Sequence, residues 1–289
     1  MLREEYKVKD ICSAMSVCRS RYYRSLNEPW PKAKVARPVF HVDGTSMADE
    51  AVLERMKKIQ TDHPFWGYRR ITAWLQHREG ICINRKKVYR LMKDNGLLQT
   101  KNKHREPRPM RSKPQATRPD QVWGIDMTKF MLNGIGWIYL VLIIDWYTKK
   151  ILAWDISLRS RSQEWRDVLN MAVLNQLPDG SRGMEVGLVS DNGSQPTSVA
   201  FMKDCKTLGI NQIFTSYNNP KGNADTERVM RTLKEEKIWL NEWPSLEEAR
   251  TGIADAVKFY NELYPHSALG YSSPVEFENM YKETILNIA

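Results

Sequence analysis

The sequence predicts an α/β core that follows a basic helical segment and ends in a helical tail. The first 120 residues hold 27 Lys and Arg against 13 Asp and Glu, whereas residues 121–289 hold 17 against 21, so the net charge of +10 lies in the N-terminal part. Short runs rich in β-branched and aromatic residues begin after residue 120 and alternate with stretches of helical spacing. These two observations divide the chain near residue 120 into a basic N-terminal part and an α/β part.

The composition excludes several classes of protein. A chain of 289 residues, 42% of them hydrophobic, can bury about two domain cores and is not expected to be disordered. Its apolar runs fall far short of the roughly 20 residues that a membrane-spanning helix needs, so we expect a cytoplasmic protein without membrane contact. The four cysteines form no Cys-x-x-Cys pair, which argues against a zinc finger or a disulfide scaffold.

The basic N-terminal part is expected to be helical. Val8–Leu26 has the spacing of two short helices, which we place in a small element at residues 1–30, and Gly67–Leu98 has the spacing of two more within a domain at residues 50–98. Asn84 is placed to cap the last of these helices. Because a helix-turn-helix sets its second helix into the major groove of DNA, a basic face there favours DNA binding, although a solvated helix is the commoner cause of such a face. The basic residues on this face are Arg85, Lys86, Lys87, Arg90 and Lys93.

A basic linker is predicted at residues 99–120. Lys101–Asp120 contains four prolines, seven Lys or Arg and almost no large apolar residue, so it cannot bury a core. We expect an extended segment that follows phosphates through Lys101, Lys103 and Arg105. A solvated spacer without contacts is the alternative.

The core, which we place at residues 121–240, has a characteristic order of elements. Three strands are predicted to form an antiparallel meander, followed by helix, strand, helix, strand and helix. That order is typical of an RNase H-like domain. The tail at residues 241–289 begins with a capping box from Ser245 to Glu248. The predicted core elements are Gln121–Phe130, Trp137–Asp145, Lys150–Ser157, Glu164–Leu177, Val186–Ser190, Val199–Leu208, Gln212–Thr215 and Ala224–Leu240.

Three acidic residues are candidates for a metal site. Asp126 lies within an apolar strand, where an unpaired carboxylate is costly. Asp191 closes a buried strand, at the sheet edge where α/β folds bind ligands. Glu227 follows after 35 intervening residues, in the first turn of the long helix, and can return to the same edge. Taken alone, each has a simpler explanation: a hydrogen-bonded aspartate, an Asx turn and an acid at a helix N-terminus.

Together, the three carboxylates would form an oxygen-rich site for two Mg²⁺ or Mn²⁺ ions. Such a pair of ions, roughly 4 Å apart, activates a water or a 3′-hydroxyl and stabilises the leaving oxygen of a phosphodiester displacement. Arg231 and Lys234 project from the same helix face as Glu227 and are placed to hold a phosphate. Asp145 and Asp225 are nearby acids to which we assign structural or supporting roles.

Several motifs resemble those of a known family. They are Gly67-Tyr68-Arg69-Arg70-Ile71, Val88–Met92, Trp123–Thr128, Ser190–Gln195, Asn223-Ala224 before Glu227, and Pro265–Tyr271. On these motifs, the chain resembles the OrfB transposases of the third insertion-sequence family, relatives of retroviral integrases with a DDE core. The resemblance implies catalytic, metal-binding roles for the three carboxylates and a DNA-end contact for Lys234. Pro196 and Gly222 depart from the family's usual tyrosine and aspartate in loops beside the site.

The resemblance also implies an activity and its partners. The fold would be a retroviral integrase-type catalytic core with an N-terminal all-α helix-turn-helix domain and a helical C-terminal tail. It would cleave double-stranded DNA at transposon ends and join the freed 3′-hydroxyl to target DNA, as a homo-oligomer on paired ends in the bacterial nucleoid, with an upstream OrfA product as a possible partner. Arg69 and Arg70 would be further DNA contacts. A nuclease of the same fold without joining activity and a catalytically inactive DNA-binding regulator are the alternatives.

Overall fold

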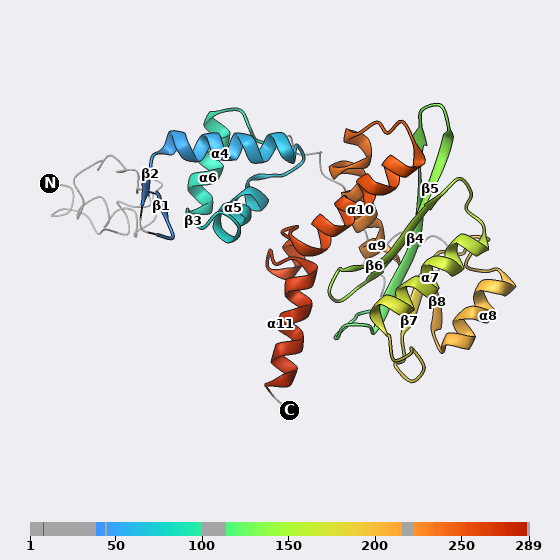
Figure 1. Cartoon of the computed structure of the whole chain (residues 1–289). Helices are drawn as coiled ribbons and strands as arrows, with labels where there is room; N and C mark the ends of the chain where they lie inside the picture. The colour runs from blue at the N-terminus through green and yellow to red at the C-terminus, as the bar shows by residue number, and fades with distance from the viewer. Residues whose placement is uncertain (1–7, 9–38, 44, 100–113, 216–221, 288–289) are drawn as a thin grey trace.

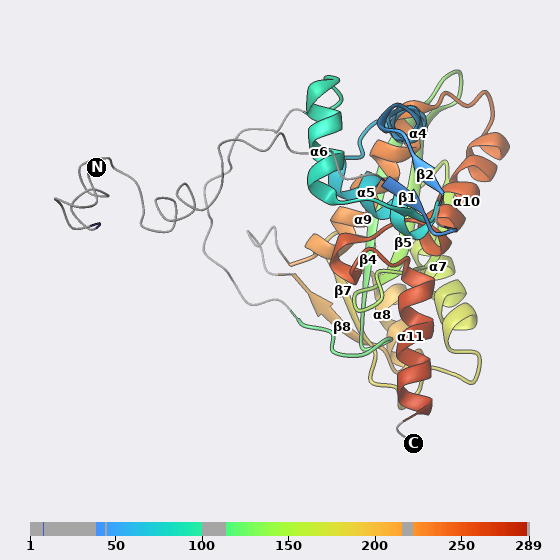
Figure 2. The same cartoon turned by 90° about the vertical axis from the view of Figure 1, so that its left-hand side faces the viewer.

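The computed structural model describes residues 8, 39–43, 45–99, 114–215 and 222–287. The predicted helical element at residues 1–30, apart from Val8, lies outside these ranges, and so do the linker residues Lys101, Lys103 and Arg105. A helical N-terminal domain lies beside a sheet covered by helices, and the last helix points away from that domain (Figures 1 and 2). Among the described helices, none has the length and apolar character needed to cross a membrane.

The N-terminal domain contains three helices and a small sheet. Its helices are α4 (Asp49–Asp62), α5 (Tyr68–His77) and α6 (Arg85–Asp94), and its strands, in the order β2-β1-β3, are β1 (Val39–His41), β2 (Ser46–Met47) and β3 (Ile81–Cys82). The Asn84 side chain accepts a hydrogen bond from Lys86 N at 2.8 Å, which confirms the predicted cap. The prediction of an all-α domain missed the sheet, because strands of two or three residues are too short to show an alternating pattern.

A five-stranded mixed sheet with the order β6-β5-β4-β7-β8 forms the core, which confirms the RNase H-like order of elements. The first three strands are an antiparallel meander, and β7 and β8 are parallel to β4. The strands are β4 (Val122–Leu132), β5 (Gly136–Asp145), β6 (Ile151–Ser157), β7 (Gly187–Ser190) and β8 (Asn211–Phe214).

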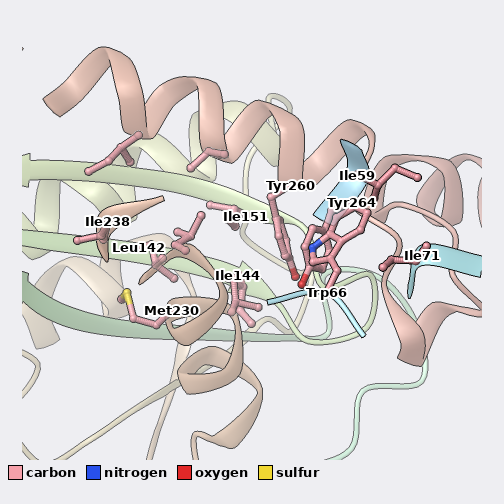
Figure 3. Close-up of a cluster of buried hydrophobic side chains, with 14 of the residues drawn as sticks. Ile59, Trp66, Ile71, Leu142, Ile144, Ile151, Met230, Ile238, Tyr260 and Tyr264 are labelled. Carbon is pink, nitrogen blue, oxygen red and sulfur yellow. The ribbon is translucent and has the colours of Figure 1, made fainter. Parts of the chain in front are cut away.

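Helices cover both faces of this sheet. On one face, α7 (Ser162–Gln176) and α8 (Val199–Leu208) pack against the β4 side chains Trp123 and Ile125. On the other face lie α9 (Ala224–Glu236) and α10 (Leu246–Glu262), and their apolar cluster continues into the N-terminal domain through Trp66 (Figure 3). Helix α9 ends at Glu236, four residues before the predicted end at Leu240, and a 3₁₀ turn, η1 (Ile238–Leu240), follows it.

The C-terminal tail is helical, as predicted. Ser245 caps α10 by accepting a hydrogen bond from Glu248 N at 3.2 Å. A 3₁₀ turn, η2 (Ser267–Leu269), then leads to α11 (Pro274–Leu286). The buried Glu278 of α11 ties this helix to the core, because its carboxylate accepts hydrogen bonds from Lys150 Nζ at 2.7 Å and Gln176 Nε2 at 3.0 Å.

Candidate active site

The sheet register brings two of the candidate carboxylates to one edge. Strands β4 and β7 are parallel neighbours, with Gly124 opposite Val189. Asp126 and Asp191 each lie two residues further along their own chain segments, and neighbouring strands are about 4.8 Å apart. Asp126 is partly buried within β4, whereas Asp191 is exposed just after β7 ends. The two aspartates are therefore neighbours at the edge where β7 ends.

The N-terminus of α9 is held against β4 at Gly124. A Cβ atom at this glycine would lie only 2.1 Å from Thr226 Oγ1 and 2.3 Å from Trp146 Nε1, so a larger residue does not fit. Trp146 Nε1 donates a hydrogen bond to Thr226 Oγ1 at 3.1 Å, and Asn223 Nδ2 donates one to the Ile125 carbonyl at 3.2 Å. This close approach places the first turn of α9 beside the strand that carries Asp126, and that turn contains Glu227.

The charges at this edge act on Asp126. Burial raises the pKa of Asp126 to about 7; the hydrogen bond from Met127 N and the charge of Lys234 lower it, and the charges of Asp191 and Glu227 raise it. Partial burial also raises the pKa of Glu227. Asp191, Glu227 and the ammonium of Lys234 therefore all lie within electrostatic reach of Asp126, and the negative charge around Asp126 is only partly compensated.

The donor set suits a hard divalent cation, although the side chains do not form a closed metal site. Within the described ranges, no group of three or more His, Cys, Asp or Glu side chains is placed to hold an ion as it stands. Asp191 Oδ1 accepts a hydrogen bond from Gly193 N at 3.0 Å, so the Asx turn considered as an alternative is present. Three carboxylates whose charge is only partly compensated nevertheless fit Mg²⁺ or Mn²⁺, which prefer oxygen ligands.

The two other acids near the site have structural partners. Asp145 is 1% exposed, and it accepts hydrogen bonds from Thr148 N at 2.8 Å and Thr148 Oγ1 at 2.7 Å, which closes the turn after β5. Burial raises the pKa of Asp145 to about 6. Asp225 lies 3.2 Å from Lys149 Nζ. These contacts agree with the structural roles expected for both residues.

The predicted DNA-contact residues lie in different surroundings. On α6, the exposed basic residues are Arg85, Lys86, Arg90 and Lys93. Lys87 differs, because its ammonium lies 2.5 Å from Asp49 and its side chain is only 11% exposed. Arg69 is exposed on α5, whereas Arg70 packs over the ring of Tyr264 at 4.7 Å. The spacing of residues on a helix could not distinguish the exposed basic side chains from those that contact other parts of the chain.

On α9, the two predicted phosphate ligands also differ. Arg231 is exposed and pairs with Glu235 at 2.7 Å. Lys234 is half-buried and acts electrostatically on Asp126. The residues that position α9, namely Gly124, Trp146 and Thr226, were not predicted from the sequence. The only signal was a glycine within a strand, which often marks close approach of another backbone.

Family models match most of the described chain. An HTH-like domain matches residues 47–105, and two models of the integrase core domain match residues 116–220 and 208–274. Transposase InsD for insertion element IS2A/D/F/H/I/K of Escherichia coli is 28% identical over 236 residues, which cover 79% of this chain and 78% of that protein. The chain resembles insertion-element transposases. This likeness confirms the predicted resemblance and supports a DNA transposase or integrase.

Solved structures give weaker likenesses. The simian T-cell lymphotropic virus intasome in complex with PP2A regulatory subunit B56 gamma is 16% identical, with a TM-score of 0.48 over 77% of this chain and 74% of that chain. The HTLV-2 integrase catalytic core domain in complex with magnesium is also 16% identical, with a TM-score of 0.45 over 57% of this chain and 99% of that chain. At these scores they add nothing to the family models and the sheet order.

Proposed function

We propose that this chain is a DNA transposase that cleaves at the ends of a mobile element and transfers the freed 3′-hydroxyl to target DNA by in-line displacement. The observation that carries the proposal is the convergence of Asp126, Asp191 and Glu227 at one sheet edge within an integrase core. The HTH-like domain in front of that core presents an exposed basic helix, which suits DNA.

The three carboxylates would hold two Mg²⁺ ions, or Mn²⁺ in their place, through their oxygens. When bound, such ions would activate the attacking oxygen and stabilise the leaving one. Glu227 is carried by the first turn of α9, which Asn223 ties to β4 and Thr226 ties to Trp146, so its position relative to Asp126 is set by the fold. Lys234, two turns further along α9, would bind a phosphate of the DNA end.

The N-terminal domain would bind the element's terminal DNA. Helix α6 would enter the major groove, and its exposed residues Arg85, Lys86, Arg90 and Lys93 would contact DNA there. Affinity would then fall steeply with salt, because each phosphate contact releases counterions. Action as a homo-oligomer on paired ends in the bacterial cytoplasm, with an upstream OrfA product as partner, is part of the same proposal.

Substitution of the carboxylates tests this function. In assays with duplexes that carry the element's own termini and Mg²⁺ or Mn²⁺, Asp126→Asn, Asp191→Asn and Glu227→Gln should each reduce 3′-end cleavage and joining more than about 100-fold, because each removes a metal ligand. DNA binding should remain near that of the wild type. Asp225→Asn is the matched control, since Asp225 lies two residues from Glu227 and pairs with Lys149. A triad variant that still transfers strands would exclude the assignment.

The same assays separate the two alternatives. A nuclease without joining activity would cleave end DNA but leave pre-cut ends unjoined. A DNA-binding regulator with an inactive site would bind end DNA and show no metal-dependent reaction. Joining of pre-cut ends by the wild-type chain in Mg²⁺ would exclude both.

A further inference from the structure

A buried tryptophan connects the N-terminal domain to the helix that carries Glu227. Trp66, in the loop between α4 and α5, is 0% exposed, and its Nε1 donates a hydrogen bond to Glu236 Oε1 at 2.8 Å. Glu236 is the last residue of α9, whose first turn contains Glu227. Figure 3 shows Trp66 beside Tyr260 and Tyr264, between the two domains. The contact is therefore an internal tie between the domains.

Two further side chains of the N-terminal domain converge on the same carboxylate. The Arg70 guanidinium lies 3.6 Å from Glu236 Oε1, and His63 Nδ1 lies 3.4 Å from Oε2. His63 also stacks between Trp66, at a centroid distance of 4.0 Å, and Phe259 of α10, at 5.1 Å. We call Trp66, His63, Arg70 and Glu236 the Glu236 latch. The Glu236 side chain is only 13% exposed; Trp66 donates the directional hydrogen bond to its Oε1, whereas Arg70 and His63 add charge and contact without a hydrogen bond to Oε2.

The latch sets a distance between two helices, because Glu236 belongs to α9 and Arg70 to α5, while Trp66 and His63 lie in the short loop that leads into α5. Glu236 and Glu227 are nine residues apart on one helix, which corresponds to about 14 Å along its axis. On the other side, α5 packs on α6, and the rings of Tyr68 and Tyr89 meet edge to face at 5.1 Å. A second tie prevents pivoting: Arg78 at the end of α5 binds Glu276 of α11 through two hydrogen bonds, of 2.6 and 3.0 Å.

We infer that the Glu236 latch holds α6 at a fixed distance from the triad and so selects which phosphodiester of the terminal DNA is cleaved. This inference rests on the proposed function. Successive nucleotides of one strand are about 3.4 Å apart along the duplex, so a shift of the N-terminal domain by that amount would present a neighbouring phosphate. The latch is thus a positioning device that decides where the reaction occurs.

Mapping the cleaved bond at nucleotide resolution tests the latch. The assay contains the full chain, Mn²⁺ and an end-labelled duplex that carries the element's terminus. Trp66→Phe removes the indole donor, and Glu236→Ala removes the acceptor. Both should spread cleavage over neighbouring phosphates and lower the ratio of correct to adjacent cuts at least about tenfold, while cleavage stays metal-dependent. Glu236→Gln retains an acceptor for Trp66 and should keep most of the wild-type preference.

The design distinguishes positioning from simple loss of stability. A destabilised but otherwise intact enzyme cuts less DNA at the same bond, because the ratio of products does not depend on the fraction folded. Glu235→Ala is the matched control, since Glu235 precedes Glu236 and pairs with the exposed Arg231. His63→Ala, which loses the stacking contacts and leaves the Trp66 hydrogen bond, should give an intermediate spread and serves where a stronger variant cuts too little to map.

The outcomes separate the two proposals. Wild-type cleavage at one bond, with the same preference in Trp66→Phe, Glu236→Ala and His63→Ala, would overturn the latch and leave the proposed function intact. A wild-type chain that cuts no end DNA would overturn the proposed function and the inference with it.

Discussion

Replacing Gly124 by alanine should destabilise the core and disturb the site together. The added Cβ would lie 2.1 Å from Thr226 Oγ1 and 2.3 Å from Trp146 Nε1, well inside van der Waals contact. These two atoms are hydrogen-bonded to each other at 3.1 Å, so the movement that relieves the clash also breaks that bond. Overpacking and the loss of a buried hydrogen bond together cost about 2–5 kcal/mol.

Urea unfolding followed by circular dichroism measures this change. Gly67→Ala is the matched control: a Cβ there meets no atom within 4 Å, the backbone φ is −86°, and the free energy of unfolding should change by less than about 1 kcal/mol. The double variant Gly124→Ala/Thr226→Ala should recover part of the loss, because it removes the nearer clashing atom. A Gly124→Ala protein as stable and as active as the wild type would refute the reasoning.

Two further predictions concern ionisable groups at the C-terminal tail. Burial raises the pKa of Glu278, but hydrogen bonds from Lys150, Lys282 and Gln176 outweigh it and lower that pKa to about 2. Lys150→Met should therefore lower the free energy of unfolding in urea by about 3 kcal/mol, because it leaves the buried carboxylate without its main partner. Lys282→Met should lower it by less than about 1 kcal/mol, because the Lys282 side chain is 61% exposed. Equal losses in the two variants would contradict the buried pairing. Burial, helped by nearby cations, lowers the pKa of His266 from 6.5 to about 4. Because the unfolded chain then binds the proton more tightly, the free energy of unfolding should be full above about pH 6.5 and fall by at most about 3 kcal/mol toward pH 4. His266→Gln should reduce this fall, and a pH profile of stability unchanged in that variant would exclude His266 as its cause.

The sequence predicted the elements whose patterns are long or bounded by strong signals. Helix α8 has the predicted limits, Val199–Leu208, because Ser198 caps it and Gly209 ends it with a φ of 70°. Helix α9 was predicted to run to Leu240 but ends at Glu236, and Ile238–Leu240 form a 3₁₀ turn. The strands β1, β2 and β3 were too short to detect.

The candidate site residues also divide into those that a local pattern indicates and those that depend on contacts between distant segments. Local motifs made Asp126, Asp191 and Glu227 the candidate site residues, whereas the contacts that position α9 join residues far apart in the sequence. Arg70 shows the limit most clearly. The family resemblance implied a DNA contact for Arg70, whereas the structure packs its guanidinium over the ring of Tyr264, a residue far away in the sequence. Composition and spacing cannot reveal such a partner.

Replacing Asp191 by cysteine tests metal binding by the triad most directly. Asp191 is exposed, so the substitution changes a proposed ligand without opening the core. A thiolate is a softer ligand than a carboxylate and disfavours Mg²⁺ more than Mn²⁺. We predict that Asp191→Cys loses cleavage of end DNA in Mg²⁺ and regains it in part in Mn²⁺, whereas the wild type cleaves in both. Wild-type cleavage by this variant in Mg²⁺ would contradict metal binding at Asp191.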